Sequence, residues 1–283
     1  AMSADTPAET RELSATERAQ RQRAVVQALG QVLPADAILY TPEDTTPYEC
    51  DGLTAYRQRP LAVALPETEA QVQAVLRACH AMDVPVVARG AGTGLSGGAM
   101  PHADGVTLSL ARFNRIVSID AISRTARVQC GVRNLAISEA AAPYGLYYAP
   151  DPSSQIACTI GGNVAENSGG VHCLKYGVTS NHVLGLEVVL PDGSVTCLGS
   201  ELDETPELDL RGAFIGSEGT LGIATAITLR LLRAPQSVAV LLADFTSMEA
   251  AGEAVRLVTA AGLLPAGMEM MDGLAINAAE DFA

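Results

Sequence analysis

Arg89-Gly90-Ala91-Gly92-Thr93-Gly94-Leu95-Ser96-Gly97-Gly98 contains five glycines in ten residues. The apolar run Val84–Ala88 leads directly into it, so the pattern predicts a buried strand that ends in a glycine-rich loop. Glycine has no Cβ atom and tolerates positive φ, which lets backbone N–H groups approach a ligand closely. Successive N–H groups in such a loop form a concave site for anions. The loop is therefore predicted to bind phosphate, with Arg89 as a charge partner.

Other interpretations of this loop must be weighed. Gly92–Gly97 matches the dinucleotide pattern G-x-G-x-x-G, and Gly94–Gly98 matches the hydrolase pattern G-x-S-x-G. Both patterns require a helix directly afterwards, whereas Gly98–Pro101 continues as loop, so both are weak alternatives. A Walker loop is excluded because the chain's one lysine, Lys175, follows leucine rather than glycine. A glycine-rich surface turn that binds no ligand stays open as a further interpretation.

Two further motifs rich in glycine and polar residues follow the loop. Pro150–Ser154 (PDPSS) precedes Thr159–Gly170 (TIGGNVAENSGG), and Gly216–Ile223 reads GSEGTLGI. With Tyr48–Leu53 (YECDGL) and Gly267–Asp272 (GMEMMD), these segments resemble the flavin-linked oxidases of the vanillyl-alcohol oxidase type, in the family's order and roughly its spacing. The resemblance extends from Tyr48 to the C-terminus and is greatest for members that oxidise 2-hydroxy acids.

The resemblance implies an α+β fold in which two subdomains clasp FAD between them and a substrate (cap) domain follows. The expected parts are an N-terminal helical segment at residues 1–47, an FAD-binding domain at 48–234 with subdomains 48–115 and 116–234, and the beginning of the cap domain at 235–283. The last helical pattern starts at Asp272 and, after Gly273, reaches Ala283 without a glycine, proline or basic stop signal. The sequence therefore predicts the N-terminal, FAD-binding half of a longer polypeptide, truncated within the cap domain.

The resemblance also assigns three sets of FAD-binding residues. The pyrophosphate would be wrapped by the glycine loop, namely Arg89, Gly90, Ala91, Gly92, Thr93 and Gly94. The flavin and its ribityl chain would be lined by Pro152, Ser153, Thr159, Gly162, Asn163, Asn167 and Gly169. The other side of the cofactor would be held by Glu218, Gly219 and Ile223. Ser, Thr and Asn suit a flavin because they offer neutral hydrogen bonds to a ring that becomes negatively charged on reduction.

The histidines indicate that FAD is bound non-covalently. Some relatives attach flavin to a histidine in the early glycine loop, where this chain has none, and His172 is not expected to replace it. His80 and His182 are expected on a helix surface and at a strand edge, and no metal site is predicted because their spacing fits none. No cluster of histidine and carboxylate suggests a general base, so the catalytic residues are expected beyond Ala283.

Composition excludes several classes of partner. A chain of 283 residues with 48% hydrophobic content can form one large or two modest domains. A net charge of -14 argues against binding to nucleic acid or to an anionic membrane surface. Six cysteines without a C-x-x-C pair indicate neither a zinc site nor a disulfide framework, and fit a reducing cytoplasm. No apolar run reaches the roughly 18 residues of a membrane span, so no membrane insertion is expected.

The function that the resemblance implies is FAD-dependent oxidation of a small 2-hydroxy acid, first of all glycolate to glyoxylate. Hydride would pass to FAD, and electrons would leave through partners, namely a second flavin-fold subunit and an iron–sulfur subunit. The location would be cytoplasmic, or peripheral to the inner membrane through those subunits, and the truncated chain alone would be inactive. Two alternatives stay open: a D-lactate or D-2-hydroxyglutarate dehydrogenase, and a subunit that binds FAD for assembly without activity of its own.

Hydrophobic periodicity and stop signals predict alternating strands and helices. Strands are expected at Leu61–Leu65, Val84–Ala88, Val106–Leu110, Ile116–Ile119, Thr125–Gln129, His182–Leu190, Ser194–Leu198, Ile223–Leu232, Ser237–Phe245 and Leu264–Met271. Helices are expected at Thr10–Leu29, after a capping box at Thr68–Gln71, at Val132–Ala142, and from Ser247 to Gly262. Tyr147–Gly177 is predicted to be a mostly irregular segment, and loops of this length are usually functional.

Overall fold

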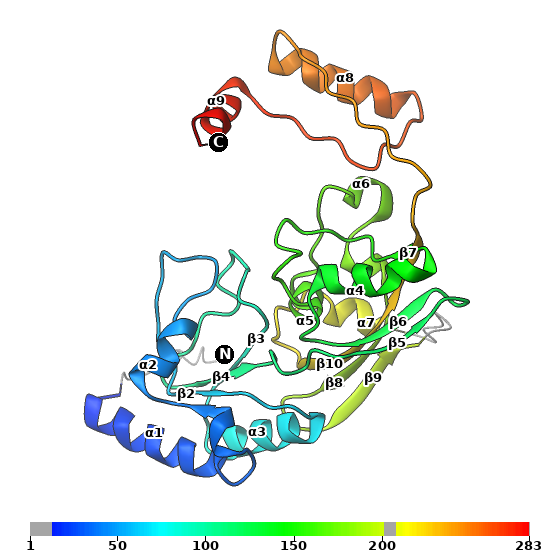
Figure 1. Ribbon diagram of the computed structural model, residues 1–283. Coiled ribbons are helices and arrows are strands. Elements are labelled where there is room, and N and C mark those ends of the chain that lie inside the picture. Colours follow the sequence, from blue (N-terminus) through cyan, green and yellow to red (C-terminus); the bar gives the residue numbers. More distant parts are fainter. Residues whose placement is uncertain (1–12, 201–207, 283) are drawn as a thin grey trace, which may run out of the picture. The chain divides into compact units, whose positions relative to one another are not determined.

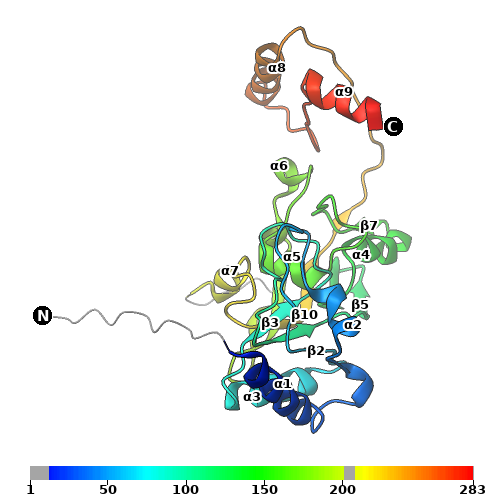
Figure 2. The same cartoon turned by 90° about the vertical axis from the view of Figure 1, so that its left-hand side faces the viewer.

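The computed structural model describes residues 13–200 and 208–282 (Figures 1 and 2). The chain divides into two compact units, of which the first comprises Ala1–Arg112 with Val189–Ser194 and the second Phe113–Val188 with Val195–Ala283. The described residues of the first unit hold a sheet of four strands, and a sheet of five strands lies in the second. Helices accompany both sheets, so the α+β fold class is confirmed.

The sheet of the first unit has the strand order β1-β2-β4-β3. Its strands are β1 (Ile38–Leu39), β2 (Ala62–Ala64), β3 (Val86–Arg89) and β4 (Val106–Ser109). β4 runs parallel to both β2 and β3, whereas β1 is antiparallel to β2. The helices of this unit are α1 (Ala15–Leu29), α2 (Pro42–Thr45) and α3 (Glu69–Ala81), with short 3-10 turns at Ala35–Ala37 and Thr46–Tyr48. α1 and α3 lie side by side in both views, and α1 also contacts β2.

Helix α3 begins at the residues that the sequence predicts. Thr68 accepts a hydrogen bond from the N–H of Gln71, and the Gln71 side chain bonds back to the backbone of the cap. The four apolar residues of the predicted helical stripe are all buried: Val72, Val75, Leu76 and Cys79. Ser14 and Glu17 form the same capping box at the start of α1, while the predicted start at Thr10 lies outside the described residues.

The larger sheet has the strand order β5-β6-β10-β8-β9. Its strands are β5 (Ile116–Asp120), β6 (Thr125–Gln129), β8 (Val183–Val189), β9 (Val195–Gly199) and β10 (Ile223–Arg230). A small second sheet pairs β7 (Leu146–Tyr147) with β11 (Leu232–Arg233). The helices are α4 (Asn134–Ala141), α5 (Ile160–Glu166), α6 (Cys173–Tyr176) and α7 (Leu210–Phe214), with 3-10 turns at Ala142–Tyr144 and Thr179–Asn181. The central strand β10 is buried over most of its length, which explains its nearly continuous apolar sequence.

The predicted strands up to Leu232 are confirmed, with small shifts at their ends. The predicted strands Ser237–Phe245 and Leu264–Met271 are wrong, because neither segment pairs with any described residue. A strand needs a hydrogen-bonding neighbour, and without one hydrophobic periodicity alone does not form it. Tyr147–Gly177 is mostly irregular, as predicted, and contains the short helices α5 and α6.

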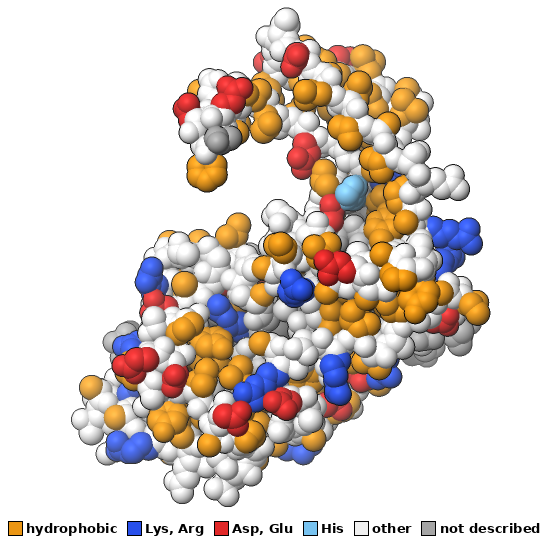
Figure 3. Space-filling model, in the orientation of Figure 1, with side chains coloured by type: hydrophobic (Ala, Val, Ile, Leu, Met, Phe, Trp, Pro, Cys, Tyr) orange, Lys and Arg blue, Asp and Glu red, His pale blue; other side chains and the backbone are white. Residues whose placement is uncertain are grey.

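The chain after residue 234 consists of α8 (Met248–Ala260) and α9 (Gly273–Phe282), joined by extended segments (Figure 1). Ser247 caps α8 as the sequence predicts. Apolar side chains gather on the visible surface over α8 (Figure 3), and Leu241 and Leu242 are each 91% exposed. Within residues 13–200 and 208–282, no helix is both long and apolar enough to cross a membrane.

Candidate functional site

The glycine loop follows directly from the end of β3, at Arg89. Gly92 and Gly97 have φ angles of 70° and 80°, a region that side-chain-bearing residues rarely adopt. No described residue accepts a hydrogen bond from the backbone N–H groups of residues 90–98. The loop is half-buried to exposed, so these N–H groups are accessible to a ligand, as an anion site requires. The loop therefore fits the phosphate site that the sequence predicts.

The Arg89 side chain packs between the glycine loop and the segment that contains Tyr48 and Cys50. It donates from Nη1 to the carbonyl oxygen of Cys50 at 2.8 Å, and its guanidinium carbon lies 5.5 Å from the centre of the Tyr48 ring. A Cβ atom at Gly92 would contact Nη2 of Arg89, so the guanidinium group packs directly against Gly92. Arg89 is only 9% exposed, and this burial lowers the pKa of its guanidinium group. Its charge can thus act on an anion through the loop.

The segment Asp51–Gly52 supports the loop, and the sequence analysis named it within Tyr48–Leu53 without giving it a role in the site. A Cβ atom at Gly52 would lie 2.7 Å from the carbonyl oxygen of Gly94 and 2.9 Å from that of Thr93, so only glycine fits there. Asp51 is 5% exposed, and its Oδ1 accepts a hydrogen bond from the N–H of Leu53 at 2.9 Å. Its Oδ2 is buried without a hydrogen-bond partner among the described residues. The one signal in the sequence was an Asp-Gly pair that precedes the loop by almost forty residues.

Two residues of the second predicted set have a geometry that suits a ligand. Thr159 precedes α5, is 7% exposed, and its hydroxyl oxygen has no hydrogen-bond partner in the described part of the chain. A Cβ atom at Gly162 would lie 3.4 Å from that oxygen, so the glycine keeps the space beside the hydroxyl group clear of a side chain. An unpaired buried hydroxyl group costs about 1–3 kcal/mol. The polar edge of a bound flavin would supply the missing partner.

Asn163 and Asn167 instead make their hydrogen bonds within the protein. Asn163 donates from Nδ2 to Oδ1 of Asn134 at 2.8 Å, and Asn134 donates to the carbonyl oxygen of Pro150 at 3.0 Å. Asn167 has a φ of 51°, and its Oδ1 accepts a hydrogen bond from the N–H of Ser180 at 2.9 Å. These amide groups fix the shape of the two polar segments, Pro150–Ser154 and Thr159–Gly170. Asn134, which the sequence analysis missed, connects them.

The remaining residues of the second set lie where the segments around them pack closely. Pro152 is buried and Ser153 is exposed. A Cβ atom at Gly169 would collide with the sulfur of Cys173, and one at Gly170 with the carbonyl oxygen of Asp151. Glycine at both positions therefore permits close packing.

The third motif joins the second along α5. The N–H groups of Gly216 and Glu218 donate to the carbonyl oxygens of Val164 and Ala165, each at 2.9 Å. Glu218 and Gly219 are exposed, whereas Ile223 is buried at the start of β10. The structure thus brings the second and third predicted sets together within one unit, although about fifty residues separate them in the sequence.

A histidine–carboxylate pair is present where the sequence analysis expected none. Nδ1 of His172 lies 2.6 Å from Oδ2 of Asp151, and the backbone N–H of His172 donates to Oδ1 of the same carboxylate at 3.3 Å. Asp151 orients the imidazole ring, and the other ring nitrogen, Nε2, is left to exchange a proton. The only signal was that both residues border the predicted flavin-lining segments.

His182 corrects another expectation, because it is buried rather than at a strand edge, with 3% exposure. Its Nε2 lies 2.7 Å from the carbonyl oxygen of Tyr176, and its Nδ1 has no partner among the described residues. Burial lowers the pKa of His182, which favours the neutral ring. The residue therefore anchors the segment after α6 to the sheet. His80 is exposed on α3, as predicted.

The cysteines do not form a chemical site. Cys130 and Cys158 are buried free thiols, and burial raises the pKa of Cys130 to about 12. In the part of the chain that the structure describes, no group of three or more His, Cys, Asp or Glu side chains is placed to hold a metal ion.

Two protein-family models match the chain. The model described as FAD binding domain matches residues 60–199, and the model described as FAD linked oxidases, C-terminal domain, matches residues 234–283. The first match contains the glycine loop and the residues around Thr159 and Gly162. FAD therefore agrees with both the matched family and the free donors of the loop.

Curated relatives share much of the sequence. The glycolate oxidase subunit GlcD of Escherichia coli (strain K12) is 58% identical over 258 residues, which are 91% of this chain and 52% of the relative. The GlcD subunit of Bacillus subtilis (strain 168) is 41% identical over 83% of this chain and 50% of its own length. A D-2-hydroxyglutarate dehydrogenase of Xanthomonas citri pv. viticola is 40% identical over 78% of this chain and 47% of its own length. The chain thus spans about half the length of these relatives.

Solved structures share the fold at low sequence identity. An alkyldihydroxyacetonephosphate synthase superimposes with a TM-score of 0.75 at 21% identity, over 87% of this chain and 47% of the other. Wild-type Phl p 4.0202, a glucose dehydrogenase, has a TM-score of 0.63 at 19% identity, over 75% of this chain and 44% of the other. These likenesses concern the arrangement of helices and strands.

Proposed function

This chain belongs to the FAD-linked oxidases, and on that basis we propose that it is the FAD-binding part of an enzyme that oxidises a small 2-hydroxy acid. The first candidate reaction is the oxidation of glycolate to glyoxylate. The observation that carries the proposal is the row of free N–H groups at residues 90–98, within a chain 58% identical to a glycolate oxidase subunit. The free donors account for a phosphate-bearing cofactor, and the relatives named for 2-hydroxy acids account for the substrate class.

The residues of this chain would hold FAD without a covalent bond. Residues 90–98 would donate hydrogen bonds to the pyrophosphate, with Arg89 contributing its charge from beside Gly92. The hydroxyl group of Thr159 would donate a hydrogen bond to the flavin, beside Gly162. No histidine occurs in residues 89–98 to form a covalent link. When bound, FAD supplies the acceptor for the hydride that leaves the substrate's α-carbon.

The chain also supplies residues that can support proton transfer and assembly. His172, oriented by Asp151, can hold a proton at Nε2 next to the segment that contains Ser153. Because the GlcD relatives are named as subunits, we include a second flavin-fold subunit and an iron–sulfur subunit as electron-accepting partners in the cytoplasm. The match at residues 234–283 supports a cap domain that begins after an FAD-binding domain at 48–234.

The cofactor is tested by absorption spectroscopy on the purified 283-residue chain. We expect a yellow protein with one FAD per chain, and acid precipitation should release all of the colour into the supernatant. A chain that stays colourless after incubation with FAD would contradict the cofactor site. Colour that remains in the acid pellet would contradict non-covalent binding.

The substrate is tested by anaerobic reduction of the flavin in a polypeptide that contains this chain and continues to the length of the GlcD relatives. Glycolate should bleach the flavin absorption faster than D-lactate or D-2-hydroxyglutarate at equal concentration. Faster bleaching by either of the other two acids would favour the corresponding dehydrogenase. No bleaching by any of them would favour an FAD-binding assembly subunit.

A further inference from the structure

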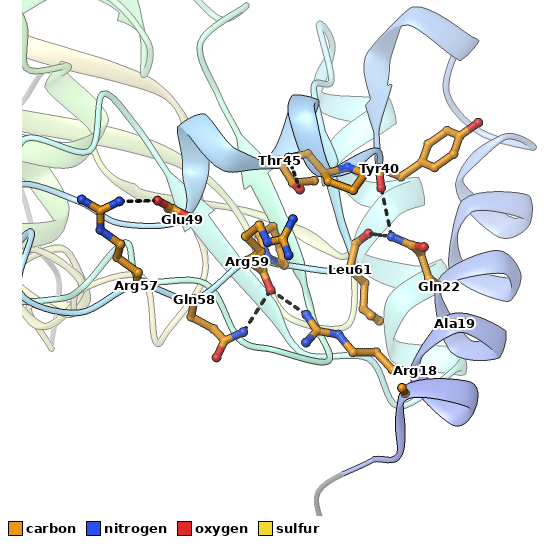
Figure 4. A pocket seen from close by; sticks show the side chains of 13 residues that line it. Arg18, Ala19, Gln22, Tyr40, Thr45, Glu49, Arg57, Gln58, Arg59 and Leu61 are labelled. Carbon is orange, nitrogen blue, oxygen red and sulfur yellow. Dashed lines mark hydrogen bonds and ion pairs between the residues drawn. The ribbon is translucent and has the colours of Figure 1, made fainter.

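We propose that the first unit carries a second anion site, which binds a small dicarboxylate in a hollow between α1 and the segment Arg57–Leu61 (Figure 4). The hollow has a volume of about 520 Å³ and lies within the range of small-molecule sites, roughly 300–1,000 Å³. No residue of the glycine loop lines it. The site is therefore distinct from the cofactor site and goes beyond the proposed function.

Hydrogen bonds between α1 and two other segments shape the hollow. Leu61 is buried at its base, beside strand β2. Gln22 of α1 donates from Nε2 to the carbonyl oxygen of Leu61 at 2.8 Å and to that of Tyr40 at 3.0 Å, as the dashed lines in Figure 4 show in part. These bonds tie the helix to two other segments that line the hollow. A preformed cavity of this kind binds a ligand without the cost of ordering its walls.

The hollow is lined by three arginines, Arg18, Arg57 and Arg59, and by one carboxylate, that of Glu49. Arg57 is paired with Glu49, with Nη1 and Oε1 2.9 Å apart, so that this acidic charge is already neutralised. Arg18 donates from Nη2 to the backbone carbonyl oxygen of Arg59 at 2.8 Å. Neither Arg18 nor Arg59 forms an ion pair with any carboxylate of the described residues. Two uncompensated positive charges therefore remain at the hollow.

The Arg59 side chain is the free binding group. Its guanidinium group makes no hydrogen bond to the described residues, and Figure 4 shows it in the centre of the labelled side chains. The backbone of Arg59 is held in place, since its carbonyl oxygen accepts hydrogen bonds from both Arg18 and Gln58. A fixed backbone with an unoccupied planar guanidinium group is suited to bidentate recognition of a carboxylate.

The ligand class follows from the number of charges and from the apolar lining of the hollow. Two unpaired guanidinium groups match an anion with two carboxylates, whereas a monocarboxylate leaves one of them unpaired. Ala15, Ala19 and Pro42 also line the hollow and are half-buried or exposed, so their apolar surface favours a short hydrocarbon between the carboxylates over inorganic phosphate. In a chain with a net charge of -14, such a local excess of positive charge also guides an anion to this place.

The test is calorimetric titration of succinate into the FAD-loaded 283-residue chain at low salt. We expect saturable binding of one succinate per chain, and affinity for propionate lower by about tenfold because one charge-assisted hydrogen-bonded contact is lost. Arg59→Gln should weaken succinate binding by about tenfold or more for the same reason. Arg59→Lys keeps the charge without the planar fork and should give an intermediate affinity.

The matched control is Arg23→Gln, since Arg23 is an exposed arginine of α1 that does not line the hollow. This variant should bind succinate with unchanged affinity. Absence of saturable succinate binding to the wild-type chain would overturn the proposal, as would equal affinities of the wild-type chain and Arg59→Gln. An equal loss in Arg23→Gln would show a diffuse charge effect and would also overturn it. FAD content measured on the same samples reports on the cofactor site separately.

Discussion

At the scale of single residues, backbone angles and close packing explain why the glycine loop should tolerate few substitutions. Gly92 combines a φ of 70° with direct packing against the guanidinium group of Arg89, so it has both a conformational and a steric reason to lack a side chain. Gly52 has the steric reason, because the carbonyl oxygens of Thr93 and Gly94 lie where its Cβ atom would be. The loop is therefore held by packing, while its N–H groups make no hydrogen bond to a described residue.

Substitution of Gly92 by valine should remove most of the bound FAD. The branched side chain would strain the backbone by about 1–3 kcal/mol and displace Arg89, so the N–H groups would lose their arrangement. The FAD content of purified Gly92→Val, measured by absorption, should fall while its circular dichroism changes little. Gly262→Val is the matched control, because Gly262 has a φ of 75° and no atom near its Cβ position. Equal FAD content in both variants would refute the role of the loop.

Substitution of Arg89 by glutamine should weaken FAD binding by about tenfold or more, because a buried positive charge acts strongly on a nearby phosphate at low dielectric. Fluorescence titration of the apoprotein with FAD measures this change. Arg112→Gln is a suitable control, since Arg112 lies in the same unit and pairs with Asp36 and Glu67 instead. If Arg89→Gln binds FAD as tightly as Arg112→Gln does, the charge beside the loop is not used.

At the scale of elements, short helices and turns hold the polar segments in place. α5 is joined to the third motif by backbone hydrogen bonds, and the segment after α6 is anchored by His182, whose Nε2 lies 2.7 Å from the carbonyl oxygen of Tyr176. A buried neutral histidine makes this anchor sensitive to acid. The ring of Tyr148 adds an edge-to-face contact with the ring of His182, with the two ring centres 5.9 Å apart.

The free energy of unfolding should decrease as the pH falls below 6.5, partly because of His182. Burial holds its folded pKa below the ordinary value of 6.5, so the unfolded state takes up the proton more readily. The loss is at most about 1.4 kcal/mol per pH unit for one proton. Urea unfolding from pH 7 to pH 5 should show a smaller decrease in His182→Gln than in the wild-type chain. His80→Gln, at an exposed site on α3, should behave like the wild type, and a similar change in both variants would contradict the assignment.

At the scale of the whole molecule, burial divides the cysteines into reactive and protected thiols. Cys197 is exposed, whereas burial raises the pKa of Cys79 to about 11 and that of Cys130 to about 12. All six cysteines are free, so each can report on the accessibility of its surroundings. Cys79 and Cys130 lie in different units, which allows the opening of each unit to be followed separately.

Alkylation of the native chain at pH 8 should modify Cys197 first. Cys79 and Cys130 should react more slowly by on the order of a hundredfold or more, because both the thiolate fraction and the access of the reagent are reduced. Mass spectrometry of peptides after timed quenching measures each rate. In urea all three should react alike, which is the internal control. Rapid modification of Cys130 in the native chain would contradict the burial of β6 and its surroundings.

Local sequence was sufficient where local chemistry is strong. Thr68 and Gln71 predicted the start of α3, and the apolar run before the glycines predicted the strand β3 that leads into the loop. Ser237–Phe245 failed as a strand because pairing depends on a neighbour that periodicity cannot specify. The pair of Asp151 and His172 was not predicted for a related reason, since the two residues are 21 positions apart and only folding brings Nδ1 and Oδ2 to 2.6 Å.

The sequence by itself determined the strands up to Leu232, the capped helix starts, the glycine loop and the family, because capping residues, glycine and hydrophobic periodicity act between near neighbours. Tertiary structure alone decided what the Arg89 side chain packs against, that Asn163 bonds to Asn134, and that Arg59 is left unpaired in a hollow. The direction of a side chain depends on packing and hydrogen bonds to residues that are distant in the chain. These contacts form only when the chain has folded.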